Sequence, residues 1–364
     1  MLFDSIPRAF GLDICDSKLR ALVLERRRDW RGKIKYFLKN YSAINLPAGL
    51  VVDGEIKDAE KLKIYIKNLL KNGVNGRIKI RGVIAALPET KTFLKEITAP
   101  KTANGDSFEL LKGELEKQIP LSLDELYLDS QELEEVKNGG EVKILVAAAP
   151  RGLVDSYTRL LEISGLTPLV LETESLAITR TLLGDADDFM RDETTVMVDI
   201  GAERTGIIFW QNGSIRLSIT SPVSGKTITA AIAKKENISL VEAEKLKIKC
   251  GLNPDKCGEI IRPIIMENLE ELVKNIRSAL RFHQERGLGA GKIEKLILSG
   301  GGANLEKLEN ILSQELKIKT RQATIPAEFI KPRFMAFNQE QFLSFVTAFG
   351  LAQRAVEDHV FGEK

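Results

Sequence analysis

The sequence predicts an α/β protein built from two related lobes, and three observations lead to this prediction. The chain has 364 residues, which is more than one simple hydrophobic core usually contains. A pattern of apolar residues, Asp-Ile, a short polar turn and an apolar strand occurs twice, around Asp13 and around Asp199. The run Gly300-Gly301-Gly302 lies between a strand-like apolar segment and a segment with helical spacing. We therefore expect one Asp-containing hairpin in each lobe.

The first part of the chain is expected to form a sheet and one helix. Ala59 to Lys71 predicts a helix because its apolar residues recur on one stripe, and Gly73 ends it. Those apolar residues are Leu62, Ile66, Leu69 and Leu70. The runs that predict strands are 10–14, 19–25, 33–44 and 81–87.

Residues from 91 to about 168 are expected to form a separate insert. It contains strand signals at 95–97, 126–133 and 142–149, around a turn at Asn138-Gly139-Gly140, and helix signals at 107–118 and 153–164. Gly165 ends the second helix, and a strand follows at 169–171. This order of strands and helices predicts a small α+β subdomain.

The second half begins with a β-unit and continues with helices. Strands are expected at 195–200, 205–210 and 214–219, and Asn212-Gly213 predicts a tight hairpin turn because both residues tolerate positive φ. Long helical patterns cover 226–249 and 260–286. A strand at 295–298 leads into the glycine run, Asn304 is suited to N-cap the next helix, and 342–355 is again helical.

Composition excludes several classes of function. Lys and Arg number 53 against 51 Asp and Glu, so the net charge of +2 gives no electrostatic case for nucleic acid. The three cysteines lack metal spacing, so neither a zinc site nor a disulfide framework is expected, and a reducing cytoplasm fits. No signal peptide or run long enough to span a bilayer is found. Membrane association is therefore expected through a partner or a weak surface patch, and the run Arg26-Arg27-Arg28 is interpreted as solvated in preference to a contact with anionic lipid.

The two hairpins and the glycine run suit a nucleotide with its metal. Carboxylates at Asp13 and Asp199 can hold Mg²⁺, through its waters, because Mg²⁺ dehydrates reluctantly. Hydroxyls of Ser17 and Thr205 can donate to phosphate, and Gly201 allows close backbone approach. The loop Gly300-Gly301-Gly302 can receive a flat ligand or a phosphate at a helix N-terminus.

Five segments in this order resemble the signature motifs of the actin, sugar-kinase and DnaK-type chaperone superfamily. LDICDSK and VDIGAERT resemble the two phosphate loops, LSGGGANL the adenosine loop, and LETESLA and TAFGLA the two connecting segments. The resemblance implies an actin-like (ribonuclease H-like) two-lobe fold that binds ATP. It also implies that Glu174 stands where the superfamily often has a water-orienting carboxylate.

Longer passages are similar to the PilM family of type IV pilus assembly proteins. They are EKQIPLSLDELYLD, LVAAAPRGLVDSYTRLLEISGLTPLVLETESLAI and VSGKTITAAIAKKENISLVEAEKLK. The resemblance implies a first lobe (1A, residues 1–195) with a 1C insert, a second lobe (2A/2B, 196–345) and a C-terminal helix (346–364) that returns to the first lobe. It also implies an ATP-binding cytoplasmic scaffold, peripheral at the inner membrane, that binds the N-terminal tail of PilN in a 1A/1C groove and contacts other pilus proteins. Self-association and ATP hydrolysis are left open.

The family pattern also assigns residues in the second lobe. Glu244 and Lys247 match ribose- and base-contacting positions, and a solvated helix face is the alternative; Gly225 matches a glycine near the nucleotide. Several residues depart from the pattern. Cys15 replaces a glycine of the first phosphate loop, Lys18 and Arg20 stand where Ser and Lys are commoner (Lys18 could supply charge to a phosphate), and Ser224 replaces the first glycine of a pair. ATP binding with weak or no turnover is therefore expected. The alternatives are an FtsA-like cytoskeletal filament protein, although the short polar tail after Ala355 lacks the FtsA membrane helix, and an active actin-fold ATPase or kinase.

Overall fold

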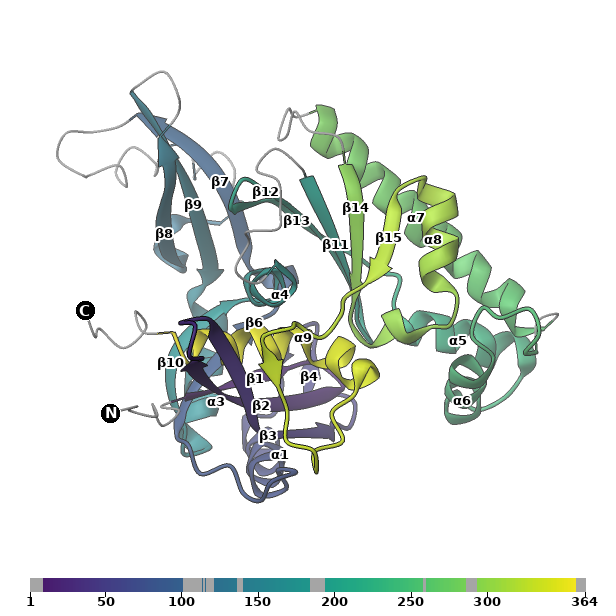
Figure 1. Ribbon diagram of the computed structural model, residues 1–364, viewed down its shortest axis with the longest axis horizontal. Helices are drawn as coiled ribbons and strands as arrows, with labels where there is room; N and C mark the ends of the chain where they lie inside the picture. The colour runs from purple at the N-terminus through teal and green to yellow at the C-terminus, as the bar shows by residue number, and fades with distance from the viewer. Residues whose placement is uncertain are drawn as a thin grey trace.

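Figure 1 shows the computed structural model of the chain. The structure describes residues 9–100, 113, 115, 121–135, 140–183, 194–257, 260–285 and 293–357. Its helices are α1 (Ala59–Lys71), α3 (Arg151–Ile163), α4 (Glu174–Leu183), α5 (Gly225–Glu236), α6 (Leu240–Cys250), α7 (Ile261–Glu285), α8 (Leu308–Leu316) and α9 (Gln339–Arg354). Short 3₁₀ turns cover Glu89–Lys91, Leu123–Glu125 and Gly301–Asn304.

The first lobe is organised around a mixed sheet in the order β10-β6-β1-β2-β3-β16. Its strands are β1 (Ala9–Ile14), β2 (Lys18–Arg28), β3 (Ile34–Asn45), β6 (Gly82–Leu87), β10 (Thr167–Thr173) and β16 (Phe329–Ile330), and the two-residue strands β4 (Val51–Val52) and β5 (Glu55–Ile56) pair beside it. Phe10 and Leu12 of β1 pack into a core with α1 and α3, whereas Ala9 packs with α9 on the other face. Burial on both faces explains why β1 is a continuous apolar run.

The second lobe repeats this arrangement. Its sheet has the order β13-β12-β11-β14-β15, and its strands are β11 (Thr194–Ile200), β12 (Thr205–Gln211), β13 (Ser214–Ser221), β14 (Ile293–Ser299) and β15 (Lys319–Gln322). In each lobe an antiparallel three-strand meander (β1-β2-β3 or β11-β12-β13) continues, beside its first strand, into two parallel strands (β6-β10 or β14-β15). In both lobes the repeated Asp-Ile pattern lies at the end of the first meander strand, at Asp13-Ile14 in β1 and Asp199-Ile200 in β11.

A third sheet projects from the first lobe and reaches the second. Its strands β7 (Phe93–Pro100), β9 (Glu141–Pro150) and β8 (Leu126–Glu135) are antiparallel, in that order across the sheet. β7 packs against β13, where Arg216 forms an ion pair with Glu96. The expected insert, 91–168, also included α3 and the start of β10, but α3 packs on α1 and β10 pairs with β6. Most of the expected helix 107–118 lies outside the described residues; Gly113 and Leu115 are helical.

Two helices lie between the sheets of the two lobes, as Figure 1 shows for α4 and α9. α4 follows β10 and leads toward the second lobe, and α9 follows the second lobe and packs on β1 and β2. The helices cross at Gly350, where an added Cβ would lie 1.9 Å from the carbonyl oxygen of Ala177. Thr181 Oγ1 also donates to the carbonyl of Val346 at 2.8 Å. The two connections between the lobes therefore pack tightly against each other.

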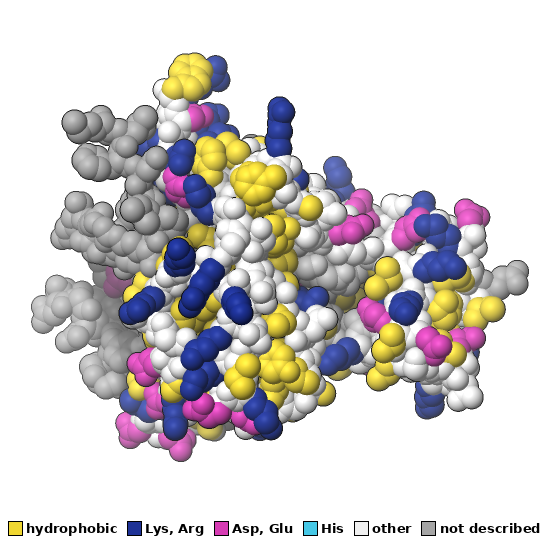
Figure 2. All heavy atoms as spheres, turned by 90° about the horizontal axis from the view of Figure 1, so that it is seen from below, with side chains coloured by type: hydrophobic (Ala, Val, Ile, Leu, Met, Phe, Trp, Pro, Cys, Tyr) yellow, Lys and Arg dark blue, Asp and Glu magenta, His cyan; other side chains and the backbone are white. Residues whose placement is uncertain are grey.

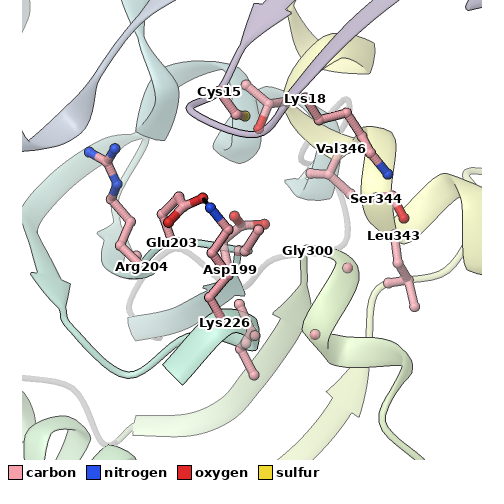
Figure 3. Close-up of a pocket in the computed structure, with 18 of the residues that line it drawn as sticks. Cys15, Lys18, Asp199, Glu203, Arg204, Lys226, Gly300, Leu343, Ser344 and Val346 are labelled. Atoms are coloured by element: carbon pink, nitrogen blue, oxygen red, sulfur yellow. Dashed lines mark ion pairs between the residues drawn. The ribbon is translucent and has the colours of Figure 1, made fainter. Parts of the chain in front are cut away.

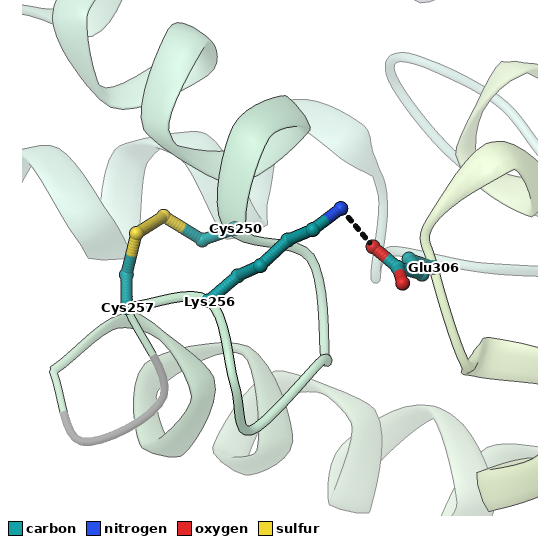
Figure 4. Close-up of a disulfide and its surroundings, with 4 residues drawn as sticks. All are labelled: Cys250, Lys256, Cys257 and Glu306. Carbon is teal, nitrogen blue, oxygen red and sulfur yellow. Dashed lines mark hydrogen bonds and ion pairs between the residues drawn. A yellow bond between two sulfur atoms is a disulfide. The ribbon is translucent and has the colours of Figure 1, made fainter.

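Three further expectations, on the helices after residue 225, on Asn304 and on the cysteines, are wrong. The pattern 226–249 is two helices, because Asn237 is left-handed with φ 53° and Ser239 starts α6 with a capping box. Asn304 does not N-cap α8, which begins at Leu308 with Lys307 at the cap position. The side-chain amide of Asn304 donates to the carbonyl of Glu340 instead. Cys250 and Cys257 form a disulfide (Figure 4), because α6 ends at Cys250 and the chain turns back so that their Cα atoms are 5.5 Å apart.

Other expectations on elements are confirmed. α1 covers the predicted residues 59–71, and the side chain of Asp58 accepts from the amide of Lys61 at its start. Asn212 and Gly213 have φ of 51° and 78° in the hairpin between β12 and β13. In the described part of the chain, every helix is too short or too polar to cross a membrane.

Candidate functional site

A cavity of about 1050 Å³ lies between the two lobes, and most of the predicted site residues line it. Those residues are Asp13, Ser17, Lys18, Glu174, Asp199, Gly201, Gly225, Glu244, Lys247, Gly300, Gly301, Gly302 and Asn304. Figure 3 shows Cys15 and Lys18 of the first lobe facing Asp199 and Glu203 of the second lobe across this space. The structure thus brings together residues up to 291 positions apart in sequence, from Asp13 to Asn304.

The hairpin between β1 and β2 supplies a buried ion pair. Asp13 and Arg20 are opposite each other in the register of these strands, and Arg20 Nη1 donates to Asp13 Oδ2 at 2.7 Å. The thiol of Cys15 donates to Asp13 Oδ1 at 3.2 Å. Both oxygens of Asp13 therefore already have donors, which burial of a carboxylate requires.

The turn of the same hairpin is held by backbone and by Asp16. The amide of Cys15 donates to the carbonyl of Lys18 at 3.0 Å, which keeps the turn tight although Cys15 replaces a glycine. The carboxylate of Asp16 accepts from the amides of Asp53 and Gly54 at 2.8 and 2.9 Å. The cavity side of this turn therefore presents Ser17 and Lys18 on a fixed backbone.

The hairpin between β11 and β12 mirrors the first in the second lobe. Asp199 is opposite Ser299 of β14, and Ser299 Oγ donates to Asp199 Oδ1 at 2.7 Å. The amide of Gly201 donates to the carbonyl of Arg204 at 2.9 Å, and a Cβ at Gly201 would lie 2.8 Å from that oxygen. Glycine is therefore needed at 201 by the turn itself.

Thr205 does not line the cavity. Its side chain is fully buried, and Oγ1 donates to the carbonyl of Val223 at 2.7 Å. The structure therefore does not bring this hydroxyl to a phosphate site. The sequence pattern could not separate the two roles, because it does not show to which side of β12 the threonine points.

The glycine loop passes close behind the second hairpin. Gly300 has φ 81°, and a Cβ on it would lie 2.4 Å from the carbonyl oxygen of Ile200. A Cβ on Gly302 would lie 2.3 Å from Cγ2 of the same isoleucine, whereas Gly301 has room. The first and third glycines are therefore explained by close packing on Ile200, and the second is open to the cavity.

Helix α6 closes one wall of the cavity with a polar pair. Lys247 Nζ donates to the carbonyl of Gly225 at 2.8 Å and to Thr229 Oγ1 at 2.9 Å, and it forms an ion pair with Glu244 at 2.7 Å. Glu244 also accepts from Thr229. The solvated-face alternative therefore does not describe Lys247, whose ammonium joins α6 to the start of α5.

Burial changes the protonation of the carboxylates in the cavity. Burial raises the pKa of Glu174 to about 8; Arg204 opposes this shift, and Asp13, Glu89 and Asp199 add to it. Burial likewise raises the pKa of Asp199 to about 6, against the hydrogen bond from Ser299 and together with repulsion from Asp13. Such shifts mean that carboxylates are crowded in a site poorly reached by water.

Lys18 and Cys15, which both line the cavity, respond to the same burial. Desolvation lowers the pKa of the Lys18 ammonium, and the nearby charge of Arg20 lowers it further. Burial raises the pKa of the Cys15 thiol well above its usual range, with the charge of Asp13 adding to the shift. Cys15 is therefore a neutral hydrogen-bond donor here and has none of the character of a reactive thiolate.

The cavity fits a cation that arrives with its own ligands. No group of three or more His, Cys, Asp and Glu side chains is placed to hold a metal ion by itself within the described residues. Asp199 and Glu174, with raised pKa values, would gain from a nearby positive charge, whereas Asp13 is already compensated by Arg20. Asp199 is thus the better suited of the two predicted metal carboxylates to gain from a nearby cation.

Sequence reasoning missed the side chains that join the lobes at this site. Arg204 Nη1 donates to Thr90 Oγ1 at 2.7 Å and lies 3.5 Å from Asp16, so it crosses from the second hairpin to the first lobe. Glu203 and Lys226 form an ion pair beside it, drawn in Figure 3. A signal was present, because Glu203 and Arg204 belong to the motif VDIGAERT, but the partner residues lie far away in sequence.

Comparison with known proteins places the chain in a family. The model of the family described as type IV pilus assembly protein PilM matches residues 11–356. The chain belongs to this family. The PilM motifs quoted above, and the residues of the cavity, therefore lie inside one continuous match.

Solved structures agree with this assignment. A PilM-PilN type IV pilus biogenesis complex superposes with a TM-score of 0.81 at 28% identity, covering 96% of this chain and 99% of that chain. MreB5 of Spiroplasma citri bound to ADP gives 0.56 at 12% identity, covering 97% of this chain and 98% of that one. EutJ of Carboxydothermus hydrogenoformans gives 0.55 at 15% identity, with 94% and 88% covered. The predicted actin-like fold is confirmed.

A more distant curated relative is the cell division protein FtsA of Buchnera aphidicola subsp. Baizongia pistaciae (strain Bp). It is 27% identical over 157 residues, which cover 34% of this chain. The match spans about a third of the length of that relative (36%). This match supports membership of the actin-like group. The PilM assignment is favoured over FtsA because the PilM family model covers nearly the whole chain.

Proposed function

We propose that this PilM-family chain is a nucleotide-binding scaffold of the type IV pilus machine that captures the N-terminal tail of a PilN-like protein. The observation that carries this proposal is the superposition on the PilM-PilN complex over 96% of the chain. The scaffold works in the cytoplasm, and the partner tail holds it peripherally at the inner membrane. Other pilus proteins bind the surface that the chain and the bound partner tail form together.

The nucleotide occupies the cavity between the lobes. ATP is the proposed ligand, and Gly301, Lys18, Ser17 and Glu244 all line the cavity. In this proposal Gly301 would leave room for the base, Lys18 and Ser17 would contact phosphate oxygens, and Glu244 would contact the ribose. Asp199 would hold Mg²⁺ through its waters, and the positive charge of the ion would offset the repulsion among the buried carboxylates. Because Arg20 already compensates Asp13, we expect affinity to depend less on Asp13 than on Asp199.

The peptide site is proposed at the β8 edge of the three-stranded sheet, beside α3. β8 is an edge strand in the described part of the chain, so its outer backbone groups can pair with an extended peptide. Tyr127 of β8 is 43% exposed, with Arg151 4.7 Å from its ring centroid and its hydroxyl donating to Asp155 at 3.1 Å. An ordered, exposed aromatic side chain at a sheet edge is a suitable anchor for an apolar peptide residue.

Peptide capture tests this assignment. Full-length protein is titrated into a fluorescent peptide of a PilN-like N-terminal tail, with and without ATP and Mg²⁺, and a scrambled peptide serves as control. Tyr127→Ala should weaken binding at least about tenfold, since hot-spot aromatics cost ~2 kcal/mol or more. Leu169→Ala, a comparably exposed apolar residue on the edge strand β10, should bind like wild type. Failure of the wild type to bind in both conditions would refute the partner assignment.

Nucleotide binding is tested separately. Calorimetry with ATP and Mg²⁺ should show binding to the wild type and much weaker binding to Asp199→Ala. Equal affinity of the two would remove Asp199 from the site. Turnover is expected to be slow or absent; a measurable ATPase rate that Glu174→Gln abolishes would instead favour the active-ATPase alternative, and ATP-dependent sedimentation of the protein alone would favour the filament alternative.

A further inference from the structure

The hairpin tip that joins β2 to β3, residues 26–35, has a composition unlike the rest of the first lobe. It contains six basic residues and one acidic residue, although the whole chain is nearly neutral. The run Arg26-Arg27-Arg28 opens it, and Arg31, Lys33 and Lys35 follow. Trp30 lies among them with 85% of its side chain exposed, the largest value of any exposed large hydrophobic residue that the structure describes.

The tip is an ordered turn that holds Trp30 outward. The side chain of Asp29 accepts from the amides of Arg31 and Lys33, each at 2.9 Å, and Gly32 has φ 77°. The amide of Asp29 also donates to the carbonyl of Lys33 at 2.8 Å. The carboxylate of Asp29 is thus bonded to the backbone of the turn. The guanidinium carbon of Arg31 lies 4.4 Å from the centroid of the Trp30 ring. These bonds fix the backbone of the turn that carries the exposed indole, and the guanidinium of Arg31 covers its ring.

The tip lies far from the nucleotide cavity. β2 begins at Lys18, which lines the cavity, and ends at Arg28. Ten residues of extended strand separate the two, about 33 Å at the usual rise. Figure 2 shows this lobe from below, with Lys and Arg side chains spread over its face and acidic side chains gathered mainly toward its lower edge. The tip can therefore contact a surface without blocking the cavity.

We propose that residues 26–35 form a direct contact with an anionic lipid bilayer. Arg and Lys side chains are attracted to anionic headgroups, and the amphipathic ring of tryptophan prefers the interface between headgroups and acyl chains. One such patch gives weak, reversible binding, and stable attachment takes a second signal. The contact raises the effective concentration of the scaffold at the membrane, where any membrane-anchored partner is found. This inference does not depend on the identity of that partner.

Vesicle binding tests the proposal. The full-length chain without any partner is centrifuged with vesicles of phosphatidylcholine alone or of phosphatidylcholine mixed with phosphatidylglycerol, at low and at physiological salt. We expect binding to the mixed vesicles that weakens with salt, and none to the neutral ones. Arg28→Glu/Arg31→Glu/Lys33→Glu should lose at least about tenfold in partition coefficient. The matched control Lys234→Glu/Lys235→Glu/Lys274→Glu, on exposed positions of the second lobe, changes the net charge equally and should keep most of the binding.

Tryptophan emission gives a second, local readout. The chain has two tryptophans, and Trp210 is buried in β12. Mixed vesicles should shift the emission of the wild type to shorter wavelength, whereas Trp30→Phe, which keeps Trp210, should show no shift. Trp30→Ser should also weaken vesicle binding. The proposal would be overturned if the wild type did not bind the mixed vesicles, or if the tip variant and the control variant lost binding equally. Absence of wild-type binding would leave an acidic protein as the partner of the tip.

Discussion

Arg20 Nη1 lies 2.7 Å from Asp13 Oδ2, and the two side chains are only 13% and 4% exposed. Arg20 of the chain itself thus neutralises Asp13, one of the two carboxylates that the sequence predicts near a metal. The pair joins two adjacent strands at the wall of the cavity, so its loss would act on folding and on ligand binding together.

Arg20→Met should therefore destabilise the protein. The substitution leaves Asp13 buried without its cation, and breaking one partner of a buried pair costs about 3–5 kcal/mol. Urea unfolding followed by circular dichroism measures the change. Arg20→Lys, which keeps the charge, should recover part of the loss. If Arg20→Met were as stable as wild type, the pair would not hold the hairpin.

Gly300 and Gly301 should respond differently to the same added methyl group. Gly300→Ala forces a side chain onto a backbone with φ 81° and into the carbonyl of Ile200, at a cost of about 2 kcal/mol or more. Gly301→Ala meets Ser344 at an ordinary 3.9 Å and should leave stability within about 0.5 kcal/mol of wild type. Thermal unfolding of the two variants checks this, and equal effects would contradict the packing explanation.

Reduction of the bond between Cys250 and Cys257 should lower stability by about 2–3 kcal/mol, the chain-entropy value for so short a loop. The loop contacts a residue that lines the cavity, because Lys256 forms an ion pair with Glu306 at 2.9 Å (Figure 4). The amide of Leu252 also donates to the carbonyl of Glu306. Unfolding with and without reductant measures the effect. Cys250→Ala/Cys257→Ser is the control and should be insensitive to reductant; three titratable thiols in the native chain would show that the bond is absent.

The raised pKa of Glu174 should make stability depend on pH. Folding raises this pKa from its ordinary 4.5 to about 8, so the folded chain keeps a proton that the unfolded chain has lost in this window. Stability contributed by this group is complete at low pH and falls as pH rises toward 8. In Glu174→Gln this decline should be smaller by up to about 5 kcal/mol, since the pKa rises from 4.5 to about 8 and each pKa unit corresponds to roughly 1.4 kcal/mol. Glu270→Gln, on an exposed position of α7, should retain the wild-type profile.

Features that depend on local sequence could be predicted. α1 follows from its apolar stripe, and the β12–β13 turn follows from Asn212-Gly213. The cavity could also be anticipated, because the two Asp-Ile hairpins and the glycine run were expected to bind one ligand together. These signals lie within short windows, where spacing and turn chemistry decide the structure.

Features that depend on distant partners could not. Nothing near β10 in sequence shows that it pairs with β6 across an intervening three-stranded sheet. The role of Thr205 depends on Val223, and that of Arg204 on Thr90 in the other lobe. The break between α5 and α6 is different, because Asn237 and the capping residue Ser239 were visible but the helical period on both sides obscured them.

At the crossing of α4 and α9, the single small residue Gly350 allows the two connections between the lobes to pack directly against each other. Ala177 and Gly350 approach through backbone, with no side chain to cushion the contact. A larger residue at 350 would push apart the two segments that set the distance between the lobes. Such a substitution would therefore change the spacing of the two Asp hairpins across the cavity, although Gly350 itself does not line the cavity.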